Sequence, residues 1–215
     1  MGTGGATPIR RLNEFIGCRP VVYCMAKNKG DLILRDRLQF TLDNEGDLNV
    51  QYGRIDLSDY VNVVRDEGLH IKEITYQLRR TGTGLKACVF DPVLGTASTA
   101  FAELQLFATT TAYEDAADVG IASPNVLNNY TMSTTREGDP ATGSFIWENQ
   151  ERFRGVYDLH PEGYTVITDL LIGAAANNCS KYADETIEID IMMIAEPKKV
   201  TKDDLERMLA QATDL

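Results

Sequence analysis

An alternation of apolar and polar residues dominates the middle of the chain. From residue 32 to residue 42 the even positions are mostly apolar, and Arg35, Arg37 and Gln39 stand between them. A period of two is typical of a strand with one buried face. Similar patterns predict strands at residues 21–26, 48–55, 69–80, 85–90, 101–110, 126–133, 144–147, 153–159, 164–174 and 186–195. Because short turns separate the first runs, we expect residues 21–55 to form an antiparallel meander.

The period changes to that of a helix near the start of the chain. Pro8 at a first helical position is followed by Ile9, Leu12 and Phe15 at helical spacing, and Gly17 ends the run. We therefore expect a short helix over residues 8–16. A helix this short needs its apolar face to dock on something.

A second helix is predicted after Pro197. Thr201 can cap its N-terminus, and acidic residues crowd the first turn, where the helix dipole favours anions. Leu205, Met208 and Leu209 share one face. This face either covers the end of its own sheet or docks on a neighbouring subunit. A shorter helical turn, capped by Ser58 or Asp59, is expected between two strands.

Many short strands without interleaved long helices predict an all-β fold, a jelly roll or β-sandwich of about eight to ten strands, with short N- and C-terminal helices. We expect an N-terminal arm at residues 1–19, the jelly-roll domain at 20–197 and the amphipathic helix at 198–215. Residues 111–143 are long and polar, so we expect an exposed loop region there.

The charge is unevenly distributed along the chain. The formal net charge is −11, yet residues 1–100 carry +1 and residues 101–215 carry −12. An acidic protein is a poor candidate for wrapping nucleic acid, which requires a dense basic surface. The first 30 residues are slightly basic, which leaves room for a weak contact with nucleic acid at the N-terminal arm.

The composition favours a protein without metal or cofactor. The four Cys are widely separated and only two His are present, so neither a zinc site nor a disulfide framework is expected. No catalytic metal or other cofactor is predicted. No apolar run is long enough for a membrane-spanning helix, and no signal peptide is visible at the start of the sequence.

Two alternative functions depend on particular residues. A carbohydrate-binding β-sandwich would present exposed aromatic residues on one sheet face, with Trp147, Tyr157 and Tyr164 as the candidates. A hydrolase would need converging carboxylates or histidines. Its candidates are His70 and His160, and the carboxylate pair of Glu148 and Glu151. Packing roles are the simpler interpretation of both histidines, and we predict no enzymatic activity.

The strand-rich plan, the polar loops and the terminal arms together resemble the single jelly-roll capsid proteins of small viruses. The segments that carry this resemblance are residues 53–62 (GRIDLSDYVN), 68–74 (GLHIKEI) and 195–209. Many such proteins carry a long basic arm that packs the genome. This chain has only Arg10, Arg11 and Arg19 near its start, so its own contact with a genome is in doubt.

The resemblance implies a non-enzymatic virion protein, made in the host cytoplasm, that self-assembles into a capsid or capsid-like shell. Its partners would be copies of itself and other virion proteins. Flat sheet flanks and terminal arms would make the contacts. The candidate subunit-interface residues lie in both terminal helices and in a basic patch: Ile9, Leu12, Phe15, Arg79, Arg80, Leu205, Met208 and Leu209.

Overall fold

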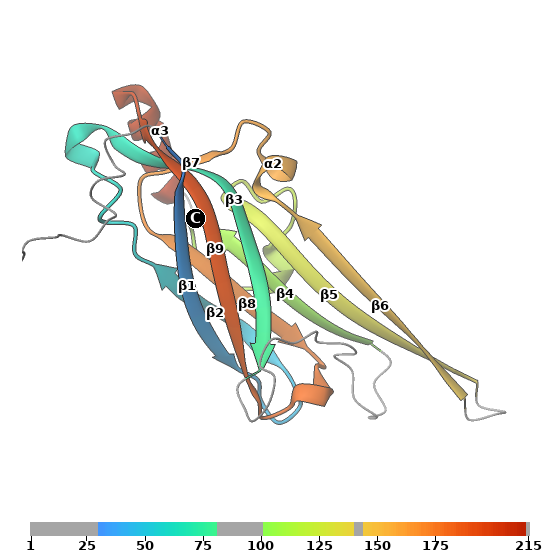
Figure 1. The fold of residues 1–215 in the computed structure, drawn as a ribbon. Helices are drawn as coiled ribbons and strands as arrows, with labels where there is room; N and C mark the ends of the chain where they lie inside the picture. The colour runs from blue at the N-terminus through green and yellow to red at the C-terminus, as the bar shows by residue number, and fades with distance from the viewer. Residues whose placement is uncertain (1–29, 81–100, 140–143, 214–215) are drawn as a thin grey trace, which may run out of the picture. The chain divides into compact units, whose positions relative to one another are not determined.

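Nine strands form two antiparallel sheets in the computed structural model, which describes residues 30–80, 101–139 and 144–213 (Figure 1). The chain divides into two units, residues 1–30 and residues 31–215, and the second holds all the elements described below. The four-stranded sheet has the order β1 (Leu32–Thr41), β9 (Thr186–Lys199), β3 (Glu67–Arg80), β7 (Tyr164–Val166). The five-stranded sheet has the order β2 (Leu48–Ile55), β8 (Leu170–Asn177), β4 (Phe101–Thr109), β5 (Val126–Asp139), β6 (Ser144–Arg154).

The strand order identifies the topology. Except for β4 and β5, each described strand before β9 is followed along the chain by a described strand of the other sheet. The chain thus winds back and forth across the sandwich, and β1 pairs with β9 near the other end of the described chain. Two four-stranded sheets wound in this way are a jelly roll, and β6 adds a fifth strand to one of them. The predicted fold class is confirmed.

The expected meander is wrong. Strand β1 pairs with β9 and strand β2 pairs with β8, so two strands that follow one another along the chain lie in different sheets. The turn after β1 carries the chain from one sheet to the other instead of folding it back. Near this crossing the sheets lie close together, because a side-chain carbon at Gly53 would overlap Leu38.

Several strand boundaries also differ from the prediction. The runs at 144–147 and 153–159 belong to one continuous β6 and a helical turn, α2 (Val156–Leu159). The run at 164–174 is divided into β7 and β8, which lie in opposite sheets. The side chain of Asp169, between them, accepts a hydrogen bond from the backbone N–H of Leu57 (3.2 Å). This hydrogen bond fixes the segment between β7 and β8 to the segment that follows β2.

The C-terminal helix is present as predicted. Helix α3 spans Lys202–Thr213, and the hydroxyl of Thr201 accepts a hydrogen bond from the backbone N–H of Asp204 (3.2 Å). The predicted turn before β3 is a 3-10 helix, η1 (Val63–Arg65), but Asn62 caps it instead of Ser58 or Asp59. The predicted helix at 8–16 and the predicted strands at 21–26 and 85–90 lie outside the described residues. The three-part domain division stays a prediction.

The core lies between the facing surfaces of the two sheets. The alternating apolar residues of β1, β3, β4, β8 and β9 point into it, as the period of two predicts. One polar side chain crosses the core. Asn128 of β5 accepts hydrogen bonds from the Tyr76 hydroxyl (2.7 Å) and the Ala108 N–H (2.9 Å), and it donates to the Ile74 carbonyl (3.1 Å). Asn128 therefore joins the two sheets.

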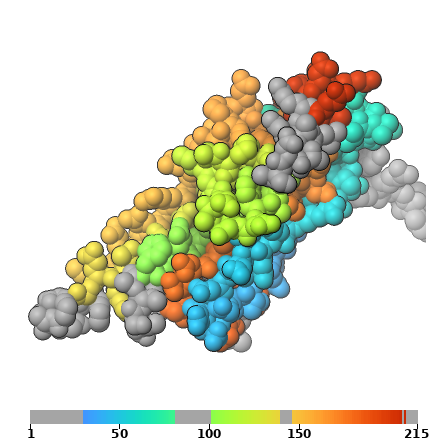
Figure 2. Space-filling view, turned by 180° about the vertical axis from the view of Figure 1, so that it is seen from behind, coloured from blue at the N-terminus to red at the C-terminus, as the bar shows by residue number. Residues whose placement is uncertain are grey.

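A second, smaller cluster lies on the outer face of the five-stranded sheet. Phe107 of β4 is buried there under the segment at 110–125, from which Val119 and Tyr113 pack against it. This segment includes the 3-10 helix η2 (Ala116–Asp118) and forms a raised mass in Figure 2. The expectation of an exposed region over 111–143 is therefore wrong in part, because Val119 is buried. The strand predicted at 126–133 within this region is present as β5, which extends to Asp139.

Candidate functional site

The most unusual surface of the described chain is β6. It pairs with β5 from Asn129↔Arg154 to Asp139↔Ser144, and no other described strand lies beyond it in the sheet. Every side chain from Ile146 to Arg154 is exposed. We call the side of β6 that faces away from β5, across residues 146–154, the outer edge of β6. An edge strand of this length is a template for pairing with another strand, so native proteins usually cover or disguise such edges.

The two faces of β6 differ in chemistry. On one face lie Trp147, 36% exposed, and Phe153, 44% exposed. Trp147 lies under the Arg136 guanidinium of β5 at 5.7 Å, and the Phe153 ring contacts Tyr130, with ring centroids 6.5 Å apart. Both aromatic rings are therefore partly supported by β5 and partly open to solvent.

Three polar side chains form a row on the other face of β6. Gln150 donates a hydrogen bond to the Glu148 carboxylate (2.8 Å), and Arg152 donates one to the Gln150 amide oxygen (2.9 Å). These bonds keep the three side chains extended along the strand. A negative and a positive charge therefore lie at equal distances on either side of Gln150.

Ion pairs link neighbouring strands on the outer face of the four-stranded sheet. Asp190 of β9 accepts a hydrogen bond from Arg37 of β1 (2.5 Å) and another from Arg79 of β3 (2.8 Å). Arg37 is the main cause of a lowered pKa for the Asp190 carboxyl. Two residue pairs further along β1 and β9, on the same face, the Gln39 amide donates a hydrogen bond to the Glu188 carboxylate (2.9 Å). Arg37, Arg79 and Asp190 are thus paired with one another within the chain.

The predicted basic patch is divided by the structure. Arg79 contacts Asp190, whereas Arg80 forms an ion pair with Glu185 and lies 5.0 Å from the centre of the Tyr182 ring. Both guanidinium groups have carboxylate partners within the chain. Their role at a subunit interface stays a prediction, as does that of Ile9, Leu12 and Phe15, which lie outside the described residues.

Two of the interface residues predicted in helix α3 have half-buried side chains. Leu205 and Met208 are both partly covered, while the side chain of Leu209 lies outside the described part. Met208 lines a small cavity together with Tyr164 and Val166 of β7. At Met208 the helix therefore covers the end of its own sheet, which was one of the two expected alternatives.

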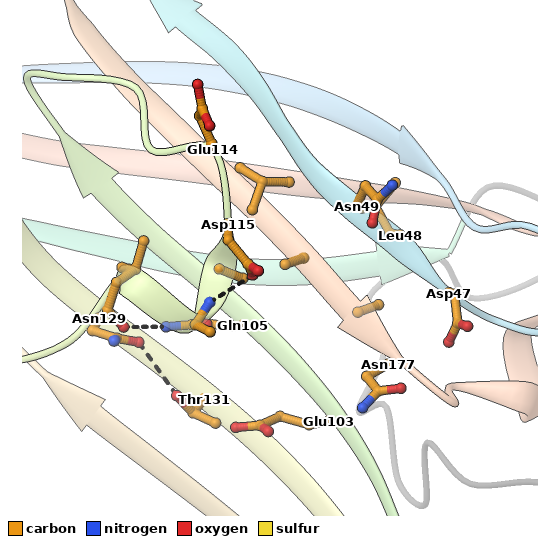
Figure 3. A pocket seen from close by; sticks show the side chains of 16 residues that line it. Asp47, Leu48, Asn49, Glu103, Gln105, Glu114, Asp115, Asn129, Thr131 and Asn177 are labelled. Carbon is orange, nitrogen blue, oxygen red and sulfur yellow. Dashed lines mark hydrogen bonds between the residues drawn. The ribbon is translucent and has the colours of Figure 1, made fainter. Parts of the chain in front are cut away.

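A groove of about 790 Å³ lies on the outer face of the five-stranded sheet (Figure 3). Strands β2, β8, β4 and β5 form its floor, and the η2 segment forms a wall. Four carboxylates from three segments line it: Asp47, Glu103, and the adjacent Glu114 and Asp115. Asp115 accepts a hydrogen bond from the Ala117 N–H (3.0 Å), so it caps η2. No cluster of three metal-ligating side chains occurs among the described residues.

Both histidines have structural partners. His70 is buried, and its Nδ1 lies 3.0 Å from the Thr165 hydroxyl. Burial is the main cause of a lowered pKa for this imidazole. His160 Nε2 lies 2.8 Å from the Val126 carbonyl, to which it donates a hydrogen bond. These contacts favour packing roles for both residues.

The predicted carboxylate pair and aromatic platform are not formed. Glu148 and Glu151 differ by an odd number of positions along β6, so they point to opposite faces and cannot converge. Trp147 lies in the five-stranded sheet, Tyr164 lies in the four-stranded sheet against His160, and Tyr157 lies in α2. The three rings therefore do not share a sheet face.

Sequence reasoning divided β6 into two shorter strands because its apolar and polar residues do not alternate. Both faces are exposed, so the hydrophobic pattern that marks a half-buried strand is missing. The signal that could have found it is the β-former content of Phe145, Ile146, Trp147 and Phe153, which lie within one uninterrupted run without Gly or Pro.

No family model and no curated protein matches the chain. Three solved structures that are similar to this chain come from viruses. Trichodysplasia spinulosa-associated polyomavirus VP1, solved in complex with 3'-sialyllactose, is 7% identical, with 78% of this chain and 96% of that chain covered and a TM-score of 0.35.

Two further structures are similar at comparable levels. A chain of mud crab dicistrovirus is 15% identical, with 91% of this chain and 81% of that chain covered and a TM-score of 0.32. A chain of desmodium yellow mottle tymovirus is 10% identical, with 94% and 95% covered and a TM-score of 0.25. Because all three TM-scores are below 0.5, the jelly-roll assignment is based on the strand order of this chain and not on these similarities. Within the described residues, no helix is long and apolar enough to cross a membrane.

Proposed function

We propose that this protein is the structural subunit of a viral capsid or capsid-like shell, and that it acts by self-assembly instead of catalysis. The observation that carries the proposal is the outer edge of β6. A strand of eleven residues with exposed aromatic side chains stands at the end of a jelly-roll sheet. A solitary soluble domain rarely leaves such an edge uncovered, since it invites pairing with other chains.

Other exposed apolar side chains support the proposal. Ile33 lies on the outer face of the four-stranded sheet, Val64 lies in η1 and Ile121 lies in the η2 segment; their exposed fractions are 56%, 94% and 74%. They are distributed over different parts of the molecule. A subunit of a closed shell needs contacts on several sides, whereas a binding module needs one.

The remaining features of the proposal follow from a shell role. The chain would be made in the host cytoplasm and would reside in the virion, next to copies of itself and other virion proteins. The slightly basic N-terminal residues would make at most a weak contact with nucleic acid, because the net charge of −11 opposes a broad one.

The test is the assembly state of the purified full chain. Light scattering over a range of protein and salt concentrations, followed by electron microscopy of the eluted species, should reveal closed particles of uniform size. A chain that stays monomeric under all conditions, with no particles in the images, would overturn the proposal.

A further inference from the structure

The unpaired backbone and the side chains along the outer edge of β6 restrict which strand could pair with it. Along residues 146–154, the backbone N–H and C=O groups that point away from β5 meet no other described strand. An edge of this kind is completed by an added antiparallel or parallel strand. The side chains decide which strand fits.

We propose that β6 pairs antiparallel with β6 of a second copy of this chain, about a two-fold axis that passes through Gln150. This inference rests on the proposed function and deepens it, because it names one contact of the shell. The two five-stranded sheets would become one continuous sheet. A two-fold contact uses the same surface on both copies, so β6 must be complementary to itself.

Charge complementarity supports this register. With Gln150 on the axis, Glu148 of each copy lies opposite Arg152 of the other, which gives two symmetry-related ion pairs. Opposite charges at directly facing positions stabilise an antiparallel pair, and like charges destabilise it. The row of hydrogen bonds through Gln150 already holds the two charged side chains extended along the strand.

The aromatic face supports the same register. Trp147 of each copy then lies opposite Phe153 of the other, which places two exposed aromatic rings in a cross-strand pair. A two-fold axis perpendicular to the sheet preserves the two faces, so only positions of equal parity can face one another. Trp147 and Phe153 satisfy this condition on one face, as Glu148 and Arg152 do on the other.

Registers shifted to either side of Gln150 form fewer favourable cross-strand pairs. An axis through Glu151 would place the two Glu151 carboxylates opposite each other. An axis through Asn149 would place Trp147 opposite Glu151 and would leave Glu148 opposite Gln150. The register through Gln150 is the one among these three that forms both the ion pairs and the aromatic pairs.

Charge reversal is the first test. Glu148→Arg or Arg152→Glu alone turns both ion pairs into repulsions and should weaken association by about tenfold or more. The double variant Glu148→Arg with Arg152→Glu restores the complementarity and should return the association to the wild-type level. Sedimentation velocity measures the association, and circular dichroism verifies that each variant folds. Equal association of all four proteins would overturn the inference.

The chain's only tryptophan supplies a second measurement. Trp147 lies in the proposed contact, so its fluorescence emission should shift to shorter wavelength as protein concentration rises and β6 becomes covered. The single charge-reversal variants should need about tenfold higher concentration for the same shift. An emission maximum that is independent of association would contradict the proposed pairing.

Disulfide cross-linking tests the register itself. In the proposed pairing the two Gln150 residues face each other about 5 Å apart, within the range for a disulfide, so Gln150→Cys should give a covalent dimer under mild oxidation. Glu148→Cys is the matched control. Its two copies would lie four positions apart along the strands, about 13 Å, and should not cross-link. Wild-type protein, treated identically, measures any cross-linking through the native cysteines.

The outcomes separate this inference from the shell proposal. Particles without a Gln150→Cys dimer would mean that a shell forms through other contacts, and the β6 pairing would be wrong. A Gln150→Cys dimer without particles would support the pairing and contradict the shell. Cross-linking of Glu148→Cys as efficient as that of Gln150→Cys would reject the register.

Discussion

Strands β1 and β6 stand at the edges of their respective sheets, yet they are constructed differently. In β1 the apolar side chains point into the core, and outward residues such as Arg37 and Gln39 are tied to β9. In β6 every described side chain from residue 146 to residue 154 is exposed, and aromatic rings are among them. The first strand is tied to its neighbour within the chain, whereas we propose that the second is completed by a second copy.

The largest contrast should come from removing an aromatic ring from each strand. Phe40→Ala in β1 removes a buried ring and should lower the free energy of unfolding by about 3–5 kcal/mol. Phe153→Ala in β6 should lower it by less than about 1 kcal/mol, because the ring is 44% exposed. Urea denaturation of the monomeric chain measures both. Equal losses would mean that β6 belongs to the core as much as β1 does.

The next effect concerns the polar bridge between the sheets. Asn128→Ala leaves the Tyr76 hydroxyl and the Ala108 N–H without their acceptor and should cost about 2 kcal/mol or more. Asn129→Ala, at the next position on the opposite face of β5, is the matched control and should cost much less. Thermal unfolding followed by circular dichroism compares the two. A control as damaging as Asn128→Ala would show that the bridge is unimportant.

A smaller effect is expected at the ion pairs beside β1. The lowered pKa of Asp190 means that its contribution to stability is present above its unfolded pKa, near 4, and is lost as pH falls through the folded value. At neutral pH, Asp190→Asn should cost no more than about 1 kcal/mol, because solvent screens partly exposed pairs. The difference from wild type should shrink below pH 4. A difference that stays constant down to pH 2 would contradict the assignment.

The smallest effect on stability is expected at Ile146. This side chain is 73% exposed, so Ile146→Ser should change the free energy of unfolding of the monomer by less than about 0.5 kcal/mol. The same variant should remain monomeric at higher concentrations than wild type, since it removes apolar area from the outer edge of β6. Chemical denaturation and light scattering give the two readings. A clear loss of monomer stability would place Ile146 in the fold instead of the interface.

The same comparison explains what the sequence could predict. The strand at 32–42 was predicted almost to the residue, because burial of one face imposes alternation on its side chains. β6 was divided into two strands because exposure of both faces removes that constraint. Alternation also identifies a face without identifying a partner, so the pairing of β1 with β9 could not be predicted from either strand alone.

The candidate surfaces were harder to predict than the fold. Arg79 and Arg80 were expected at an interface as a basic patch, but their carboxylate partners, Asp190 and Glu185, lie more than a hundred residues away in the sequence. No local pattern reveals such pairs. The complementarity of Glu148 and Arg152 about Gln150 is visible in the sequence, but it has meaning only once residues 144–154 are known to form one edge strand.

The account is tested most directly by a cryo-electron microscopy reconstruction of whatever the purified full chain assembles into. It predicts closed particles in which two five-stranded sheets join across a two-fold axis at Gln150, with β6 beside β6 of the neighbouring copy. Closed particles in which the outer edge of β6 faces solvent would contradict the pairing, and a chain that forms no particle would contradict the proposed function.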